Sequence, residues 1–442
     1  MKIGHGNDLT IDSAFQTENY LRSNMTDKKG FSRRAFLRDS MAALVSTALP
    51  VVADEEKSSS PNEQIRIGII GLGGMGNSHI NAIQNLKNSG YPVEIVAVCD
   101  VYQVRLDAAA TRTGASPYKD YRKLLERRDI DAVSIATPDH WHSRMTVDAA
   151  DAGKDVYCEK PMTHWRNLQE AKDVVEAIRR NKRVMQVGTQ FMSSSIWEQV
   201  NDRIKAGAIG TLIHAQASDM RNGQINVYDP KTHDGLADPT KNLDWKMWLG
   251  PAEKRPWEPG RFFAFRSFWD YSGGCGTDFF PHRLTPLIRA MGLKFPRRVC
   301  ASGGQYQLKQ DGREVPDIFT ITAEYPDGPS VLLVASLATD AGIPWVIRGH
   351  EGTVNLDINS AVIEPEQAIV GDKGVREEIQ AWRPCSLEEH FKDFLDCVKS
   401  RRKPRSHEVL GYQVMTVLHM GIHSFRKNKV YEFDPTTEQV KG

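Results

Sequence analysis

The chain has 442 residues, of which 40% are apolar, and this is enough material for two globular domains. Its 57 lysines and arginines are balanced by 56 acidic residues, so we expect no nucleic-acid partner. Its six cysteines include no CxxC pair, which argues against a zinc ribbon and against a disulfide framework.

The first part of the chain is interpreted as an export signal. Residues 32–38 read Ser-Arg-Arg-Ala-Phe-Leu-Arg, which resembles a twin-arginine motif, and the weakly apolar run 41–52 is too short to span a bilayer. Val51 and Ala53 are small enough for a signal peptidase. We therefore predict an N-terminal extension and signal peptide at 1–53, and a periplasmic or secreted mature protein that is not bound to a membrane. Residues 54–64 are charged and contain serines, as in a linker.

A glycine-rich turn follows the first predicted strand, 65–70. The turn reads Gly-x-Gly-x-x-Gly from residue 71 to 76, and a helical pattern begins at Met75. In a dinucleotide site the first glycine makes the tight turn, the second lets the backbone approach the pyrophosphate, and the third lets helix and strand pack closely. The helix N-terminus then presents free N–H groups to the anion. This context favours a nucleotide site over a turn without a ligand, and the candidate contacts are Gly71, Gly73, Gly74, Met75 and Gly76.

Asp100 ends the next apolar strand, 93–99. A carboxylate at this position can accept hydrogen bonds from both ribose hydroxyls and repels a 2′-phosphate. The predicted cofactor is therefore NAD, in preference to NADP.

Strand and helix patterns alternate through residues 65–187, the predicted nucleotide-binding domain. Such alternation predicts a doubly wound parallel sheet, with ligands at the carboxyl ends of its strands. The strands are predicted at 65–70, 93–99, 132–136, 155–158 and 183–187, and the helices near 75–88, 103–113, 119–127, 141–152 and 167–180.

Two of these strand ends carry residues suited to chemistry. Residues 137–142 read Thr-Pro-Asp-His-Trp-His, and residues 159–161 read Glu-Lys-Pro. Because the proline disfavours a helical Lys160, we expect its ammonium at the sheet edge, either solvated or, beside a nicotinamide, stabilising a substrate alkoxide. No third ligand accompanies His140 and His142, so we predict no metal site. The candidate cofactor contacts here are Thr137, Pro138, His142, Glu159 and Lys160.

The pattern changes at residue 188, where a second domain, 188–442, is predicted to begin. A helix at 193–206 and a strand at 212–220 precede a long polar and aromatic segment, 221–271. Segments of that length are usually functional or held by packing. Their rings can cover a sheet, stack on a sugar, or do both. The candidate substrate contacts are Arg221, Arg266, Trp269 and Tyr271.

The rest of this domain is interpreted as a sheet and two closing helices. Strands are predicted at 298–302, 319–325, 331–337, 345–349 and 353–356, and helices at 387–400 and 408–425. The basic run from Arg401 to Arg405 is interpreted as a solvated loop.

The succession of these motifs resembles the Gfo/Idh/MocA oxidoreductases, named after glucose–fructose oxidoreductase and inositol dehydrogenase. The resemblance covers residues 63–425 and rests on the glycine turn, the Thr-Pro and Glu-Lys-Pro motifs, and Asp278-x-x-x-His282. It implies a Rossmann domain, a C-terminal α/β domain with a large open, mainly antiparallel sheet, and hydride transfer to or from a sugar or cyclitol. It also implies that Asp278 and His282 approach Lys160 and share the proton transfer, and that the protein is a homo-oligomer.

The sequence departs from the family pattern next to the histidine. Pro281 stands where glycine is common, and Thr285 where an acidic residue often follows. Because Pro281 and Pro286 disfavour a regular helix, the sequence leaves open whether Asp278 and His282 lie on one face.

Three functions are compatible with these motifs. The first is an exported NAD-dependent oxidoreductase that acts on a secondary hydroxyl of a sugar, sugar derivative or cyclitol and keeps its cofactor tightly bound. The second is a glycoside hydrolase that oxidises the sugar transiently, eliminates the aglycone, adds water and reduces again. The third is a non-catalytic sugar or nucleotide sensor, against which the acid/base pair of Lys160 and His282 argues. A keto sugar would indicate the first function and a released aglycone the second.

Overall fold

The computed structural model describes residues 64–442, apart from 224–228, 230–232, 310–311 and 327. The predicted signal at 1–53 and residues 54–63 of the predicted linker lie outside this range. Within the described part, no helix combines the length and the apolar character needed to cross a membrane.

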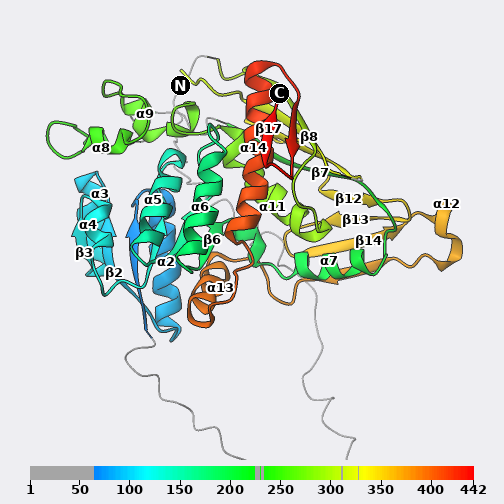
Figure 1. The fold of residues 1–442 in the computed structure, drawn as a ribbon, viewed down its shortest axis with the longest axis horizontal. Coiled ribbons are helices and arrows are strands. Elements are labelled where there is room, and N and C mark those ends of the chain that lie inside the picture. The colour runs from blue at the N-terminus through cyan, green and yellow to red at the C-terminus, as the bar shows by residue number, and fades with distance from the viewer. Residues whose placement is uncertain (1–63, 224–228, 230–232, 310–311, 327) are drawn as a thin grey trace, which may run out of the picture. The chain divides into compact units, whose positions relative to one another are not determined.

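The N-terminal sheet is parallel and has six strands in the order β3-β2-β1-β4-β5-β6. Figure 1 labels its strands β2, β3 and β6 together with the helices α2 to α6 of the same domain. Its apolar strands are buried between two separate hydrophobic clusters, as in a doubly wound fold. The elements are β1 (Ile65–Ile70), α2 (Gly74–Asn88), β2 (Val93–Cys99), α3 (Gln103–Thr113), β3 (Ser116–Tyr118), α4 (Tyr121–Leu125), β4 (Ala132–Ile135), α5 (Asp139–Asp151), β5 (Asp155–Glu159), α6 (Gln169–Arg180) and β6 (Met185–Gly188). The predicted doubly wound sheet is confirmed.

The C-terminal sheet has eleven strands and is mainly antiparallel, as predicted. Its order is β15-β14-β13-β12-β7-β10-β9-β8-β16-β17, with β11 paired to the end of β7, and the central pair β7–β10 is parallel. The strands are β7 (Leu212–Asn222), β8 (Arg298–Gly304), β9 (Ile318–Glu324), β10 (Ser330–Ser336), β11 (Ala338–Thr339), β12 (Val346–Gly349), β13 (Gly352–Leu356), β14 (Ser360–Pro365), β15 (Glu377–Gln380), β16 (Tyr431–Asp434) and β17 (Gln439–Lys441).

Helices cover one face of this second sheet. Along β9 every second side chain is buried, which is the pattern of a sheet with one packed face. On this face of the sheet α14 (Glu408–Lys427) packs against β8 and β9, α11 (Phe280–Met291) against β7 and β10, and α7 (Ile196–Lys205) against β14 and β15. The other helices are η2 (Gln190–Ser193), α8 (Trp245–Leu249), α9 (Pro259–Phe263), η3 (Phe265–Ser267), α10 (Cys275–Asp278), α12 (Gln367–Val370), η4 (Gly371–Lys373) and α13 (Leu387–Ser400).

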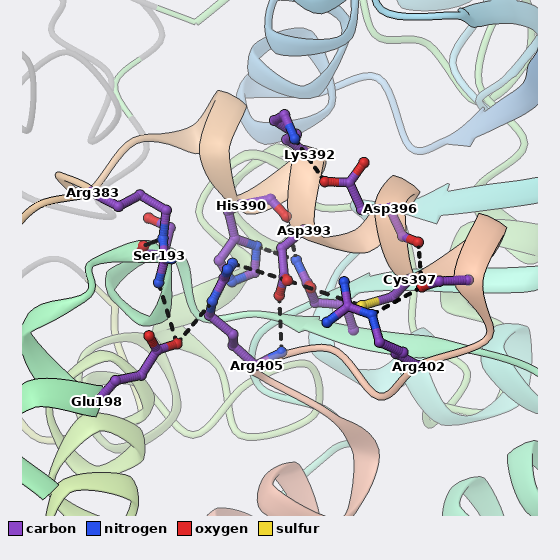
Figure 2. A network of polar contacts seen from close by, with 12 residues as sticks. Ser193, Glu198, Arg383, His390, Lys392, Asp393, Asp396, Cys397, Arg402 and Arg405 are labelled. Carbon is purple, nitrogen blue, oxygen red and sulfur yellow. Dashed lines mark hydrogen bonds and ion pairs between the residues drawn. The ribbon is translucent and has the colours of Figure 1, made fainter. Parts of the chain in front are cut away.

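The basic run between α13 and α14 holds the two halves of the fold together. Arg401 donates two hydrogen bonds to the buried carboxylate of Asp155, at 2.6 and 2.9 Å. Arg405 pairs with Glu198 of α7 at 3.0 Å and with Asp393 of α13 at 2.9 Å, and Figure 2 shows these side chains converging. The run is a loop, as predicted, and the side chain of Arg401 is 44% exposed, but the prediction did not include these ion pairs. Arg401 is the partner of the buried Asp155, and Arg405 pairs with two partly exposed carboxylates.

The long segment after β7 packs against the N-terminal sheet domain. Leu243 pairs with Tyr102 in an isolated bridge, and the amide of Asp244 donates to the carbonyl of Val101 at 3.0 Å. We call the cluster around this junction the aromatic cover, which consists of Tyr102, Leu243, Trp245, Trp248, Leu249, Ala252, Phe262 and Tyr271. Most rings of the segment that the structure describes are thus used for packing.

Candidate functional site

The glycine turn between β1 and α2 has the geometry of a phosphate-binding turn. Gly71 has φ of +87°, and a Cβ at Gly76 would collide with the carbonyl oxygen of Gly71. Gly73 is the N-cap of α2, and no side chain caps this helix. The first N–H groups of α2 therefore remain available for an anion.

Asp100 lies beside this turn at the end of β2. Its Oδ2 accepts a hydrogen bond from the amide of Leu72 at 2.7 Å, and its Oδ1 from the amide of Tyr102 at 2.9 Å. Burial raises the pKa of the carboxyl, and Arg105 and the backbone amides oppose this rise. A carboxylate has about four acceptor positions, so Asp100 can hold the turn and still accept bonds from ribose hydroxyls.

Arg105 is a further cation at this end of the site, and sequence reasoning did not single it out. A Cβ at Gly73 would lie 3.5 Å from its Nη1, and its guanidinium carbon is 5.0 Å from the ring centroid of Phe262 in the aromatic cover. Arg105 could have been identified from the sequence by its position, because it lies in the first turn of α3, the helix that follows the predicted ribose-binding Asp100.

His142 connects the strand ends that follow β4 and β5. Its Nδ1 lies 2.6 Å from the carbonyl oxygen of Pro161, and its Nε2 lies 2.8 Å from that of Thr137. Each ring nitrogen faces a backbone carbonyl oxygen within hydrogen-bond distance, so His142 connects these two loops and neither nitrogen is turned toward the cofactor. Thr137 and Pro138 remain partly exposed at the strand end, and the Lys160–Pro161 peptide bond is cis.

Glu159 is also bound within the protein. Its Oε1 lies 3.0 Å from Nε2 of His79, and Gln190 donates to it at 2.7 Å. Nδ1 of His79 in turn lies 2.8 Å from the hydroxyl of Ser134. These contacts connect α2, β4, β5 and η2. Glu159 therefore helps to fix the end of β5, which Lys160 directly follows.

Lys160 and Asp278 form an ion pair between the two halves of the fold. Nζ of Lys160 lies 2.6 Å from Oδ1 of Asp278 and 2.7 Å from its backbone oxygen. Arg266 donates to the same Oδ1 at 3.0 Å. Burial alone would raise the pKa of Asp278, but the charges of Lys160 and Arg266 hold it far below its usual value. The carboxylate is therefore ionised and fixes the direction of the Lys160 side chain.

His282 reaches the same site because a helix forms despite the two prolines. The short helix α10 ends at Asp278, and α11 begins at Phe280 with Pro281 in its first turn, where a missing N–H is tolerated. Pro286 lies inside α11, where it removes the amide that would bond to the carbonyl of His282. Asp278 and His282 thus lie on two successive helices, α10 and α11, and not on one face of a single helix, which the sequence had left open.

The environment of His282 keeps its imidazole neutral. Burial, and then the charge of Lys160, hold its pKa well below the usual value. Its Nδ1 is buried without a hydrogen-bond partner among the described residues, and its ring centroid lies 5.2 Å from that of Phe191. A neutral imidazole beside a lysine ammonium can accept a proton from a substrate.

Asp139 is a second site residue that sequence reasoning missed. It is buried, and its Oδ2 accepts a hydrogen bond from the hydroxyl of Thr277 at 2.9 Å. Because Thr277 directly precedes Asp278, this bond connects the start of α5 to α10. Burial raises the pKa of Asp139. Its signal in the sequence is its place next to the Thr-Pro motif.

Arg221 approaches the site from β7. Its Nε lies 3.2 Å from Oδ1 of Asp219, and its guanidinium carbon is 4.4 Å from the ring centroid of Phe279. Arg283 on α11 lies 3.5 Å from the other oxygen of Asp219. The structure thus brings Arg221 and Arg266, two of the four predicted substrate contacts, to the site.

Trp269 and Tyr271 lie elsewhere. Tyr271 is completely buried in the aromatic cover, with its ring centroid 4.7 Å from that of Trp248, so it cannot contact a substrate. Trp269 packs on Trp165, at 5.4 Å between ring centroids, and under Arg426 of α14. The prediction for Tyr271 is therefore wrong because its ring is completely buried, whereas the partly buried ring of Trp269 packs against Trp165 and Arg426.

In the described ranges no group of three or more His, Cys, Asp or Glu side chains is placed to hold a metal ion. The six cysteines are free. A separate cleft of about 620 Å³ is lined by side chains of α4, α5 and α6 and contains none of the predicted site residues.

Two family models match the chain in succession. Residues 65–189 match the Gfo/Idh/MocA model described as an oxidoreductase family, NAD-binding Rossmann fold. Residues 198–442 match the model described as the C-terminal alpha/beta domain of that oxidoreductase family.

Curated relatives are similar over part of the chain. Inositol 2-dehydrogenase of Salmonella typhimurium is 32% identical over 149 residues, which are 33% of this chain and 43% of that protein. A glycosyl hydrolase family 109 protein of Shewanella sp. (strain ANA-3) is 30% identical over 184 residues, 38% of each chain. The chain thus spans less than half the length of these relatives.

Solved structures share the fold over most of the chain. Levoglucosan dehydrogenase, in complex with NADH and levoglucosan, superposes with a TM-score of 0.64 at 19% identity and covers 84% of this chain and 99% of that one. The WlbA dehydrogenase from Bordetella pertussis, in complex with NADH and UDP-GlcNAcA, has a TM-score of 0.62 at 20% identity over 84% of this chain and 99% of that one.

Proposed function

Since the chain belongs to the Gfo/Idh/MocA family of oxidoreductases, we propose that it is an NAD-dependent enzyme acting on a secondary hydroxyl of a sugar, sugar derivative or cyclitol. The observation that carries this proposal is the ion pair of Lys160 and Asp278 beside a neutral His282. A fixed ammonium next to a proton acceptor suits the removal of a proton from a hydroxyl group.

The polar groups of the site divide this work. In the oxidising direction His282 accepts the hydroxyl proton through a ring nitrogen, and the ammonium of Lys160 stabilises the substrate oxygen as it becomes negative. Asp278 is far too acidic to take the proton itself, so it orients Lys160 and Arg266. In the reducing direction His282 returns the proton to the substrate oxygen, while the ammonium of Lys160 stabilises the negative charge on that oxygen.

The residues at the glycine turn fit NAD. Gly71 and Gly76 allow the close packing that a pyrophosphate requires, the N-terminus of α2 is uncapped, and Asp100 is placed for the ribose. When bound, the cofactor supplies the hydride acceptor or donor.

The aromatic cover supports slow release of the cofactor. Within this cluster Leu243 pairs with Tyr102, which lies two residues after Asp100. Arg105 lies between the ring of Phe262 and the glycine turn. A cofactor that leaves slowly cannot be exchanged after each turnover. The enzyme would then close its own redox cycle, by reducing a second carbonyl compound or by returning the hydride to the same sugar.

A substrate screen tests the proposed activity. Mature protein with NAD is incubated with free sugars, cyclitols and glycosides, and the absorbance of reduced nicotinamide is recorded together with a chromatographic analysis of the sugars. The proposal requires a keto product from at least one of them. Cofactor binding without any product would favour the non-catalytic sensor.

A second candidate is a glycoside hydrolase that oxidises its sugar transiently. The similarity to a glycosyl hydrolase family 109 protein, at 30% identity over 184 residues, favours it. The same proton acceptor and ammonium would serve the oxidation and the final reduction. Release of 4-nitrophenol from nitrophenyl glycosides, without a keto sugar as the end product, would identify this activity.

Export and self-association complete the proposal. The motif at 32–38 supports transport by the twin-arginine route with cleavage after Ala53, and cell fractionation with N-terminal sequencing tests it.

The face of the C-terminal sheet that carries the half-buried Leu332 and Val334 supports a homo-oligomer, which light scattering after gel filtration tests.

A further inference from the structure

Arg266 is the most exposed of the three charged groups that pair at Lys160. Asp278 is shared by two cations, Lys160 and Arg266, so the three ion-paired groups together carry one net positive charge. The side chain of Arg266 is 30% exposed, whereas that of Asp278 is 14% exposed. The side chain of Arg266 is therefore more accessible to solvent than that of its carboxylate partner.

A second group with the same composition stands beside the first. Asp219 is shared by Arg221 and Arg283, and the side chain of Arg221 is 26% exposed against 11% for Asp219. The rings of Phe279 and Phe191 lie against these two guanidinium groups and separate them from the core.

Charges from both groups of ion pairs influence the same two side chains, His282 and Asp278. Lys160, Arg221 and Arg283 all lower the pKa of His282, and Arg221 and Arg266 both lower that of Asp278. The positive charges therefore gather around the predicted proton acceptor.

The other carboxylates near the site are turned inward. Asp139 is 4% exposed and bound to Thr277, and Glu159 is 4% exposed and bound to His79 and Gln190. They moderate the total charge, but they cannot contact a substrate. Oxidised nicotinamide would bring a further positive charge to the same place.

We infer that the substrate is an anionic sugar, which carries a carboxylate or a sulfate ester and binds through Arg221 and Arg266. A guanidinium presents two parallel N–H donors that match the paired oxygens of such groups, and the hydrogen bonds are strengthened by charge. The inference rests on the proposed function for the reaction, but the contact between the anion and the arginines is independent of turnover.

Matched sugar pairs test the inference by calorimetry on mature protein loaded with NAD. The pairs are glucose, galactose and mannose against their uronic acids, and glucose and galactose against their 6-sulfates, so each pair differs only at carbon 6. In at least one pair the anion should bind about tenfold to a hundredfold more tightly, the worth of one charge-assisted hydrogen bond. A preference within the uronic acid pairs would indicate a carboxylate substrate, and a preference within the 6-sulfate pairs would indicate a sulfate ester. The advantage should shrink as salt is added.

Variants identify the side chain responsible. Arg221→Gln should remove most of the preference for the anionic sugar. Arg221→Lys should retain part of this preference because lysine keeps the positive charge but lacks the paired N–H donors of a guanidinium. Arg402→Gln, at an exposed arginine on the loop before α14, is the matched control and should leave the advantage unchanged. A thermal melt of each variant shows that the fold is intact.

The outcomes separate this inference from the proposed reaction. Equal or weaker binding of the anion in every pair, or no binding of any sugar, would overturn the inference. Turnover of neutral sugars alone would also overturn it and leave the dehydrogenase activity standing. Preferred binding of anions without turnover of any sugar would support the inference and refute the proposed reaction.

Discussion

Nζ of Lys160 lies 2.6 Å from Oδ1 of Asp278, although the two residues are 118 positions apart in the chain. One stands at the end of β5 and the other at the end of α10, so the pair forms only when both halves of the fold are in place. This contact is the core of the proposed site, because it holds an ammonium beside the neutral imidazole of His282.

His282→Ala is expected to lower the turnover rate by about 10² to 10⁴, the usual contribution of a general acid or base. His282→Gln, which keeps a polar side chain of similar size, should show the same loss. Steady-state kinetics with the substrate from the screen measures the rate, and a thermal melt measures stability. If turnover persists and only the melting temperature falls, the histidine is a packing residue.

The pH profile of oxidation is expected to extend to acidic pH. Because the pKa of His282 lies well below 6.5, the imidazole stays neutral and able to accept a proton as the pH falls through that value. The acid limb of kcat/KM should therefore lie well below pH 6.5. A limb centred near pH 6.5 would mean that the titrating group has an ordinary histidine pKa and is not this one.

The same shift affects stability, with a definite sign. Below pH 6.5 the unfolded chain protonates His282 while the folded protein does not, so the unfolded state binds more protons. His282 therefore lowers the free energy of unfolding as the pH falls below 6.5, and it has no such effect above pH 6.5. Denaturant unfolding at several pH values compares the unmutated protein with His282→Gln, which should show the shallower decline.

Much of the fold could be predicted from local patterns. The predicted bounds of β1, β2 and α3 agree with the structure because continuous apolar runs and a clear helical period mark them. The strands β3, β11, β14, β15, β16 and β17 were not predicted. They are short strands at or near the sheet edges, where pairing partners distant in sequence decide whether a strand forms.

The site could be predicted only where a motif fixes a position on the backbone. Lys160 was found because a proline motif places it at a strand end, whereas Asp278 and its approach to Lys160 came only from the resemblance to the family, since a contact between distant residues has no local signal. Tyr271 was assigned wrongly because composition shows that a segment is aromatic but not which way each ring points. Asp139 and Arg105 were missed because their roles depend on Thr277 and on the aromatic cover, which only the tertiary structure brings near.

Asp100→Ser is expected to weaken NAD binding by about tenfold to a hundredfold, because the ribose loses a charged acceptor. NADP should gain relative to NAD, since its 2′-phosphate loses a like-charged neighbour while Arg105 stays nearby. Calorimetry on protein stripped of cofactor gives both affinities. Asp100→Asn, which keeps an acceptor oxygen for the amide of Leu72, controls for loosening of the turn. Tighter binding of NADP than NAD by the unmutated protein would contradict the assignment.

Mature protein is expected to retain nicotinamide cofactor through gel filtration without any being added. The physical reason is the aromatic cover over the end of β2, which slows release. Absorbance of the supernatant after denaturation measures the retained cofactor. Phe262→Ala, which removes the ring beside Arg105, should release it sooner. Recovery of cofactor-free protein that makes many turnovers only with added NAD would contradict the closed redox cycle.

The most direct test of the account is the yield of reduced nicotinamide in a single turnover of Lys160→Met. Methionine keeps most of the apolar stem and removes the ammonium, and Lys123→Met, at an exposed lysine of α4, is the matched control. The account predicts that Lys160→Met still binds NAD but forms reduced nicotinamide at least about a thousandfold more slowly, while the control reacts like the unmutated protein. A rate for Lys160→Met within about twofold of the unmutated protein would show that Lys160 has no part in the reaction.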